Sequence, residues 1–263
     1  MKSERHCPIC KSTMHFAFQN TLLLKYTVDY FSCNDCGLLQ TENPYWLEEA
    51  YNEVVSKFDT GIVSRNINNK QVLIPLLSYL FKGKGQYIDL GGGTGLLTRL
   101  LRDVGLDCYL SDKYNNNVFA KPFQLNIGIK ANALFAFEVL EHIEDPLDFI
   151  NSNFQNYNCN TLILSTVTFN GKVPEKNWWY YGFEHGQHIT FYQPKTISRL
   201  AKELKCKYYR IGENHYLISA LALSSFTLFL FTNKLFFWLL SRYYGIRSQT
   251  SLIERDFSSI KLF

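Results

Sequence analysis

The sequence predicts an α/β fold in which a mostly parallel sheet is covered by helices on both faces, with a small cysteine-paired module ahead of it. Three observations indicate this organisation. An apolar run at 87–90 enters the glycine cluster Gly91–Gly95 and continues with leucines at helical spacing. Further short apolar runs follow at 107–112, 131–137 and 160–167. Two Cys-x2-Cys pairs precede this region, and they predict a separate module at the N-terminal end.

Composition limits the chain to one sizeable α/β domain with an appendage, because it has 263 residues of which 46% are hydrophobic. Its 27 basic and 23 acidic residues give a net charge of +4, which is too mild and too evenly spread for a nucleic-acid surface. The charged N-terminus has no apolar run behind it, so we expect neither a secretory signal nor a leading membrane anchor. The expected location is cytoplasmic, where cysteines stay reduced and paired cysteines indicate a metal site.

The two Cys-x2-Cys pairs are separated by 22 residues and predict a zinc site. Each pair can place two thiolates on one face of a tight turn, and four thiolates complete a tetrahedral Zn²⁺ site. Such a site is closed, so the predicted Zn²⁺ is structural and stabilises a zinc ribbon too small for a core of its own. His6 and His15 are weaker candidate ligands. The predicted metal ligands are Cys7, Cys10, Cys33 and Cys36.

The glycine cluster Gly91–Gly95 stands at a strand-to-helix turn and predicts a ligand site. Glycines permit backbone angles closed to other residues and let a ligand approach the main chain. Asp112 ends the next predicted strand, where a carboxylate can accept hydrogen bonds from ribose hydroxyls. Two alternatives stay open, a glycine-rich loop without a ligand and a solvated turn aspartate.

The spacing Asp-x-Gly-x-Gly-x-Gly at 89–95 resembles the first motif of class I S-adenosylmethionine-dependent methyltransferases. A second stretch, Glu138–Pro146, resembles the Glu-Val-Leu-Glu-His-Ile-x-Asp-Pro segment that follows the fourth strand in many small-molecule members. The resemblance implies a Rossmann-like, seven-stranded sheet with the cofactor S-adenosylmethionine at the carboxyl ends of the parallel strands. The cofactor-binding residues that it implies are Asp89, Gly91, Gly92, Gly93, Gly95, Asp112, Phe137 and Glu138.

The stretch 169–192 follows the fifth predicted strand and gathers aromatic and titratable side chains. Its end, 186–196, resembles the Glu-His-x-x-Phe-Phe-x-Pro-Lys segment of the same methyltransferases, with Gln187 in place of the glutamate. The resemblance implies that His188 takes the acceptor's proton. The candidate catalytic residues are therefore His188 and its nearest substitutes, His185 and Glu184.

Plainer roles for these histidines stay open. The aromatic stretch can be a cover in which His188 only hydrogen-bonds the loop. His142 is a further candidate base, although a hydrogen bond from His142 to Glu141 or to a backbone carbonyl is the favoured interpretation.

Three further strands complete the predicted sheet, a weak one at 118–123 and a final hairpin of 207–211 and 216–223 that makes one strand antiparallel. Two helices between 44 and 81 are expected to form a lid over the cofactor cleft. Tyr51 or Arg65 could reach the cleft from this lid, although packing and solvation are their plainer roles. The expected divisions are a zinc ribbon at 1–43, a helical lid at 44–82, a cofactor-binding core at 83–225 and a C-terminal helical extension at 226–263.

Residues 226–244 are rich in phenylalanine and leucine, but Asn233 and Lys234 interrupt the run before it reaches the length of a membrane span. We expect an amphipathic or core-covering helix. The alternative is a peripheral membrane helix, with lipid-facing charges at Lys234, Arg242 and Arg247.

The residues 33–40, Cys-Asn-Asp-Cys-Gly-Leu-Leu-Gln, are also similar to the cysteine-rich N-terminal segment of some sugar C-methyltransferases. Together the resemblances imply an S-adenosylmethionine-dependent methyltransferase acting on a small polar acceptor, such as a nucleotide-activated or polysaccharide-precursor sugar. One alternative is a zinc-ribbon RNA methyltransferase, for which a clustered basic face is missing. The other is a non-catalytic, methyltransferase-like scaffold, against which the intact glycines and Asp112 argue.

Overall fold

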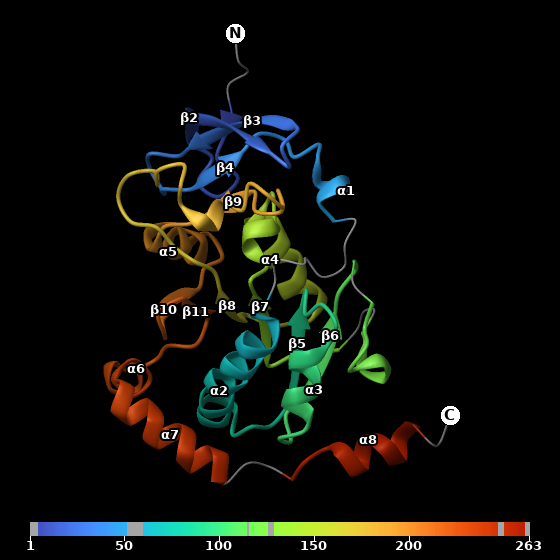
Figure 1. The fold of residues 1–263 in the computed structure, drawn as a ribbon. Helices are drawn as coiled ribbons and strands as arrows, with labels where there is room; N and C mark the ends of the chain where they lie inside the picture. Colours follow the sequence, from blue (N-terminus) through green and yellow to red (C-terminus); the bar gives the residue numbers. More distant parts are fainter. Residues whose placement is uncertain (1–4, 52–59, 115, 126–128, 247–249, 261–263) are drawn as a thin grey trace.

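The computed structural model describes residues 5–51, 60–114, 116–125, 129–246 and 250–260, and the chain forms two sheets (Figure 1). The larger sheet lies at the centre of the molecule and carries the predicted cofactor-binding core. The smaller sheet is built mostly from the N-terminal residues, and it lies at one end of the core sheet (Figure 1).

The core sheet has six strands in the order β10-β11-β8-β7-β5-β6. The four strands from β8 to β6 are parallel, while β11 runs antiparallel to both of its neighbours, as the predicted hairpin requires. The bounds of the strands are β5 (Gln86–Leu90), β6 (Asp107–Ser111), β7 (Ala133–Phe137), β8 (Thr161–Ser165), β10 (Lys207–Arg210) and β11 (His215–Ser219).

The predicted seventh strand at 118–123 is wrong. Its segment contains the 3₁₀ helix η1 (Lys121–Phe123), and within the described residues only an isolated bridge between Leu110 and Gln124 continues the sheet beyond β6. Pro122 lies inside η1, and proline has no N–H group to donate to a neighbouring strand. The core sheet therefore ends at β6.

Helices cover both faces of the core sheet, as predicted. Residues of β7 alternate between the two faces: Leu134 packs in one apolar cluster with α4 and α5, while Phe135 packs in the other with α2 and α3. The bounds of these helices are α2 (Ile62–Phe81), α3 (Leu96–Arg102), α4 (Pro146–Asn156) and α5 (Pro194–Glu203). Of the first predicted lid helix, α1 (Leu47–Ala50) is present, and the continuation at 52–59 lies outside the described residues.

The N-terminal sheet has five antiparallel strands, and its last strand comes from far along the chain. Its strands follow the order β1-β2-β3-β4-β9, in which β9 lies beyond the core strand β8 in sequence. The residues expected as a separate zinc ribbon therefore share a sheet with the aromatic stretch. The bounds are β1 (Arg5–His6), β2 (Thr13–Leu22), β3 (Tyr26–Ser32), β4 (Leu39–Thr41) and β9 (Thr190–Phe191).

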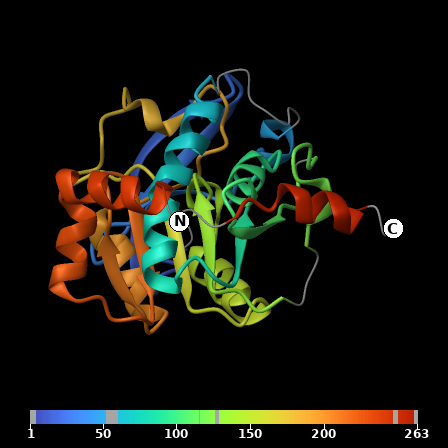
Figure 2. The same cartoon turned by 90° about the horizontal axis from the view of Figure 1, so that it is seen from below.

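Three C-terminal helices lie on the side of the core away from the N-terminal sheet, across the bottom of Figure 1 and in front in Figure 2. The middle helix, α7, packs against α2. The last helix, α8, is joined to α3 by two ion-paired hydrogen bonds, of 2.9 and 2.6 Å, between Arg102 and Asp256. In the part of the chain that the structure describes, no helix has the length and hydropathy of a membrane span. The bounds are α6 (Ser225–Thr232), α7 (Lys234–Ile246) and α8 (Ile253–Ile260), and Arg247 lies outside the described residues.

Candidate active site

A cleft of about 1810 Å³ opens at the carboxyl ends of β5, β6 and β7. The glycine loop after β5, the end of β6 and the end of β7 line it together, as expected for ligands of an open α/β sheet. Residues of the aromatic stretch and the first residues of the N-terminal sheet also line it. The cleft therefore brings together the motifs that the sequence places more than 100 residues apart.

The glycine loop needs glycine for two different reasons. A Cβ added to Gly92 would lie 2.3 Å from Asp89 Oδ2, so this position must stay small for the loop to pack on the strand. Gly93 has a left-handed φ of +58°, and an added Cβ would meet no atom within 4 Å. Gly93 therefore presents bare backbone to the cleft, where a ligand can approach it.

Asp89 and Gly95 hold the loop in place. Asp89 is buried and accepts a hydrogen bond of 3.1 Å from the Thr98 hydroxyl on α3, and burial raises the pKa of this carboxyl to about 7. A Cβ added to Gly95 would lie 2.7 Å from Asn117 Oδ1, so Gly95 faces the following loop. Of these two predicted cofactor residues, Asp89 lines the cleft and Gly95 packs behind it.

Asp112 stands beyond the end of β6 at the edge of the cleft. Its Oδ2 accepts a hydrogen bond of 2.9 Å from the Gly93 backbone N–H, and its Oδ1 accepts one of 2.8 Å from that of Tyr114. These bonds fix the carboxylate beside the bare backbone of the glycine loop. The pair has the chemistry that a ribose and an adjoining polar chain require, so the residues fit S-adenosylmethionine.

Phe137 ends β7 and Glu138 follows it, and both residues line the cleft. Glu138 has a φ of +53°, a conformation that is uncommon for residues other than glycine. The Ser165 hydroxyl, at the end of β8, donates a hydrogen bond of 2.6 Å to Glu138 Oε1. Strained residues of this kind cluster at ligand sites, which favours a functional position for this carboxylate.

His142 and His188 meet on the same side of the cleft, with ring centres 5.0 Å apart. The Nδ1 atom of His142 lies 3.0 Å from the Gln187 carbonyl oxygen, and that of His188 lies 2.7 Å from the Tyr180 carbonyl oxygen. These are the backbone hydrogen bonds that the plainer interpretation of both residues predicts. Burial lowers the pKa of His142 to about 4 and that of His188 well below its usual value, so both imidazoles are neutral near pH 7.

The remaining catalytic candidates differ in whether they line the cleft. His185 lines the cleft, and its Nδ1 accepts a hydrogen bond of 3.1 Å from the Gln187 backbone N–H. Glu184 is exposed and does not line the cleft. Tyr51 and Arg65, the expected lid residues, both line the cleft.

The sequence-based search for functional residues missed the pairing of Glu141 with Tyr180. Glu141 is fully buried, and its Oε1 accepts a hydrogen bond of 2.7 Å from the Tyr180 phenol. The signal that could have found it is the second glutamate of the Glu-Val-Leu-Glu-His motif, three residues after Glu138. Glu141 does not itself line the cleft, but the next residue, His142, does.

In a comparison of the sequence with models of protein families, a methyltransferase domain matches residues 65–209, more than half of the chain. The chain belongs to this methyltransferase family. Membership confirms the methyltransferase part of the predicted enzyme class. A search of curated proteins finds no match.

Several solved methyltransferase structures are similar to this chain at low identity. CalO1, a methyltransferase in calicheamicin biosynthesis bound to S-adenosylhomocysteine, is 10% identical with a TM-score of 0.45, over 61% of this chain and 56% of CalO1. Magnesium protoporphyrin IX methyltransferase from Synechocystis PCC 6803 is 15% identical with a TM-score of 0.43, over 65% and 90% of the two chains. The plantazolicin methyltransferase BpumL is 10% identical with a TM-score of 0.45, over 74% and 89%. This methyltransferase thus spans just over half the length of CalO1.

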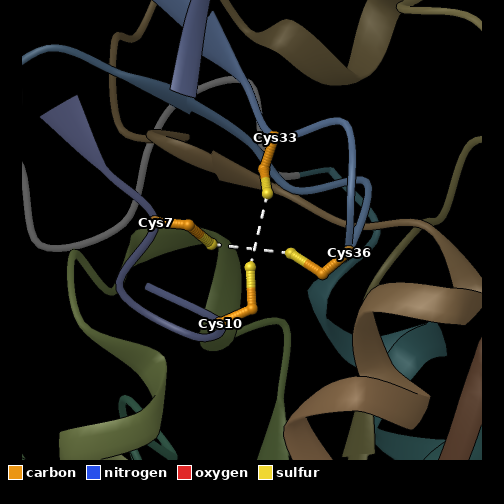
Figure 3. Close-up of side chains that lie close together, drawn as sticks. All are labelled: Cys7, Cys10, Cys33 and Cys36. Atoms are coloured by element: carbon orange, nitrogen blue, oxygen red, sulfur yellow. Dashed lines mark hydrogen bonds between the residues drawn. The ribbon is translucent and has the colours of Figure 1, made fainter. Parts of the chain in front are cut away.

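The four paired cysteines of this methyltransferase come together beside the cleft, where Cys7 also contributes to the lining (Figure 3). Their sulfur atoms lie within 4.8 Å of one another, with Cys7 and Cys36 separated by 3.5 Å and Cys10 and Cys33 by 3.4 Å. Zn–S bonds of about 2.3 Å place the sulfurs of a tetrahedral site about 3.8 Å apart. The cluster therefore fits one tetrahedral ion. His6 and His15 are not members of the group.

Proposed function

We propose that this methyltransferase moves a methyl group from S-adenosylmethionine to a small polar acceptor, a nucleotide-activated or polysaccharide-precursor sugar. One observation carries the proposal: the glycine loop with Asp112 and the histidine-bearing aromatic stretch line one and the same cleft. A cofactor held by the first would present its methyl group toward the second. Such positioning accounts for much of the rate of a methyl transfer.

Part of the cleft lining suits a phosphorylated, hydroxyl-rich acceptor, alongside acidic side chains such as Glu48, Glu144 and Asp148. Basic side chains suit the phosphates of a nucleotide, and amide side chains both donate to and accept from sugar hydroxyls. The basic residues of the lining are Arg5, Lys11, Arg65 and Lys113, and its asparagines include Asn66, Asn69, Asn153 and Asn156. Two of the basic residues belong to the N-terminal sheet, so this sheet would help to select the acceptor.

Proton removal from the acceptor is proposed to involve the pair His185 and His188. Both residues line the cleft, and their ring centres lie 4.8 Å apart. Burial lowers the pKa of each ring, which keeps a neutral imidazole available to accept a proton near pH 7. Glu184 stays a weaker candidate because it lies outside the lining.

The direct test is mass spectrometry of products formed from S-adenosylmethionine and a panel of nucleotide sugars, with transfer RNA and ribosomal RNA as parallel acceptors. We expect one nucleotide sugar to gain a methyl group. Methylated RNA with unmodified sugars would instead support the zinc-ribbon RNA methyltransferase. Calorimetry that finds no binding of S-adenosylhomocysteine would refute cofactor use and favour the scaffold.

Two further expectations are proposed with this function. We propose that Cys7, Cys10, Cys33 and Cys36 hold one structural Zn²⁺, because four thiolates leave no position open for a substrate.

A cytoplasmic location stays a prediction, with peripheral membrane contact through the C-terminal helices. This contact is supported by the exposed apolar side chains on α6 and α7 and by the charged residues of these helices, which are both basic. The exposed apolar residues are Phe226, Phe229, Leu235, Phe236, Trp238 and Leu239, and the basic residues are Lys234 and Arg242.

A further inference from the structure

The carboxylate of Glu141 is buried, and only one of its two oxygen atoms accepts a hydrogen bond from a described residue. Tyr180 donates to its Oε1, but Oε2 has no hydrogen-bond partner among the described residues, although the side chain is fully buried. Glu138 lies close enough for the two like charges to repel, and burial together with Glu138 raises the pKa of Glu141. A buried carboxylate with an unsatisfied oxygen requires either a proton or a cation.

Two neighbouring histidines each keep one ring nitrogen that can bind a metal. A carbonyl oxygen can only accept a hydrogen bond, so the contacts to the Gln187 and Tyr180 carbonyls place the hydrogen of His142 and of His188 on Nδ1. Each Nε2 then keeps its lone pair. This is the arrangement found in most metal-binding histidines, whose second ring nitrogen donates to a carbonyl or carboxylate.

His185 provides a contrast within the same cleft. Its Nδ1 accepts a hydrogen bond from the Gln187 backbone N–H, so in the neutral ring the hydrogen is on Nε2. That nitrogen packs against Gly182, where an added Cβ would lie 2.0 Å from it. His185 is therefore poorly placed to bind a metal, although its ring lies beside that of His188.

We propose that Glu141, His142 and His188 bind one divalent transition-metal ion at the acceptor end of the cleft, with Glu138 as a neighbouring carboxylate. One ligand atom from each of the three residues lies within 4.8 Å of the others. Two imidazoles and a carboxylate suit ions such as Mn²⁺, Fe²⁺ or Zn²⁺, and three protein ligands leave coordination positions open. The ion also balances the charges of the two glutamates.

The role of this ion rests on the proposed function. An open coordination position would hold an oxygen atom of the acceptor beside the cofactor's methyl group, and a bound cation makes a hydroxyl easier to deprotonate. His188 would then be a metal ligand, and the acceptor's proton would pass to solvent. Binding of the ion itself does not depend on methyl transfer.

The experiment is a titration of the purified full chain with Mn²⁺, followed by electron paramagnetic resonance, because the signal of free aqueous Mn²⁺ broadens on binding. We expect one bound Mn²⁺ per chain and nitrogen couplings from two histidines in the pulsed spectrum. Glu141→Gln and His188→Gln should each weaken binding at least about tenfold. His185→Gln is the matched control for a histidine in the same cleft, and Cys206→Ser changes a cysteine outside both clusters; both should bind Mn²⁺ like the wild type.

The results separate the site from the function. A wild-type chain that binds no Mn²⁺ at millimolar concentration, or binds it without nitrogen couplings, overturns the site even if a ligand variant fails to fold. Wild-type affinity in both ligand variants also overturns it. Calorimetry with S-adenosylhomocysteine in the absence of metal tests the cofactor separately. Cofactor binding without Mn²⁺ binding refutes only the metal site, and methyl transfer at full rate in chelator refutes its role in holding the acceptor.

Discussion

The hydroxyl of Thr196 donates a hydrogen bond of 2.7 Å to the backbone carbonyl of Cys36. Thr196 stands in the first turn of α5, and Cys36 belongs to the second cysteine pair. Lys195, one residue earlier, donates to the carbonyl of Asn34 at 3.2 Å. The second cysteine pair is thus attached to the start of a core helix, so disorder in the cysteine cluster would be transmitted to the core.

Loss of a cysteine ligand should therefore destabilise the whole chain. We expect metal analysis to find one Zn²⁺ per chain in the wild type and almost none in Cys33→Ser. A loss of about 4 kcal/mol would lower the melting temperature by roughly 10 °C. The matched control is Cys206→Ser, a partly buried cysteine outside the cluster, which should keep its zinc. A Cys33→Ser chain that melts like the wild type would contradict this coupling.

Gly93 gives a direct test of the cofactor site. Because an added side chain at this position meets no neighbouring atom and the residue lines the cleft, Gly93→Arg should fill the site and abolish S-adenosylhomocysteine binding measured by calorimetry. Gly171 is the matched control, with a similar φ of +71° and equally open space, but it does not line the cleft. Gly171→Arg has the same backbone strain and should bind normally. Equal loss in both variants would attribute the effect to strain instead.

The Arg102–Asp256 pair predicts a large effect on stability. Both side chains are almost fully buried, so Asp256→Asn removes one of the two carboxylates paired with the buried guanidinium, leaving Asp107 at 2.6 Å, and should lower the free energy of unfolding by about 3 kcal/mol. The control is the more exposed pair of Arg199 and Glu203, where Glu203→Gln should change it by less than about 0.5 kcal/mol. Urea unfolding monitored by circular dichroism measures both. Similar values for the two variants would show that α8 is not anchored by this pair.

The same pair predicts a loss of stability in acid. Burial is the largest single influence and would raise the pKa of Asp256, but the hydrogen bonds and charges of Arg102 and Arg99 together outweigh it, and the folded-state pKa lies below the usual value of 3.8. A depressed carboxyl pKa stabilises the fold above the unfolded-state value, and this contribution disappears as pH falls through the folded-state value. We expect wild-type stability to fall below about pH 4, with a smaller slope in Asp256→Asn. If the stabilities of the wild type and of Asp256→Asn fall with pH at the same slope, other carboxylates cause the loss of stability in acid.

The exposed side chains of α6 and α7 predict binding to anionic membranes. The wild type should co-sediment with vesicles that contain phosphatidylserine, and less with pure phosphatidylcholine, because the helices combine apolar and basic side chains. Trp238→Asp should reduce sedimentation several-fold. Leu24→Asp is the control, since Leu24 is 97% exposed on the N-terminal sheet. Equal sedimentation of the two variants would argue against this surface.

Local patterns in the sequence were enough to predict much of the core and part of the site. The strand, glycine turn and helix around Gly91–Gly95 form as expected because periodicity and glycine act within a few residues. The four cysteines also meet as predicted, since their spacing is a local signal. The strand expected at 118–123 does not form, because the weak apolar pattern there competes with Pro122.

What could not be predicted depends on contacts between distant residues. Nothing near Glu141 in the sequence shows that Tyr180 donates a hydrogen bond to it, nor that the carbonyls of Gln187 and Tyr180 orient two histidine rings. Likewise, the two residues of β9 have no strand pattern of their own. They become a strand because β4 offers them a partner.

The pairing of β4 with β9 also means that the N-terminal sheet cannot be completed early in synthesis of the chain. Leu39 pairs with Phe191 and Gln40 with Thr190, so the edge of the N-terminal sheet has no partner until a ribosome has synthesised some 150 further residues. During that interval the exposed edge is open to pairing with another nascent chain. Fragments that stop before β9 should therefore aggregate through β4, and expression of this protein should benefit from a chaperone that shields that edge during translation.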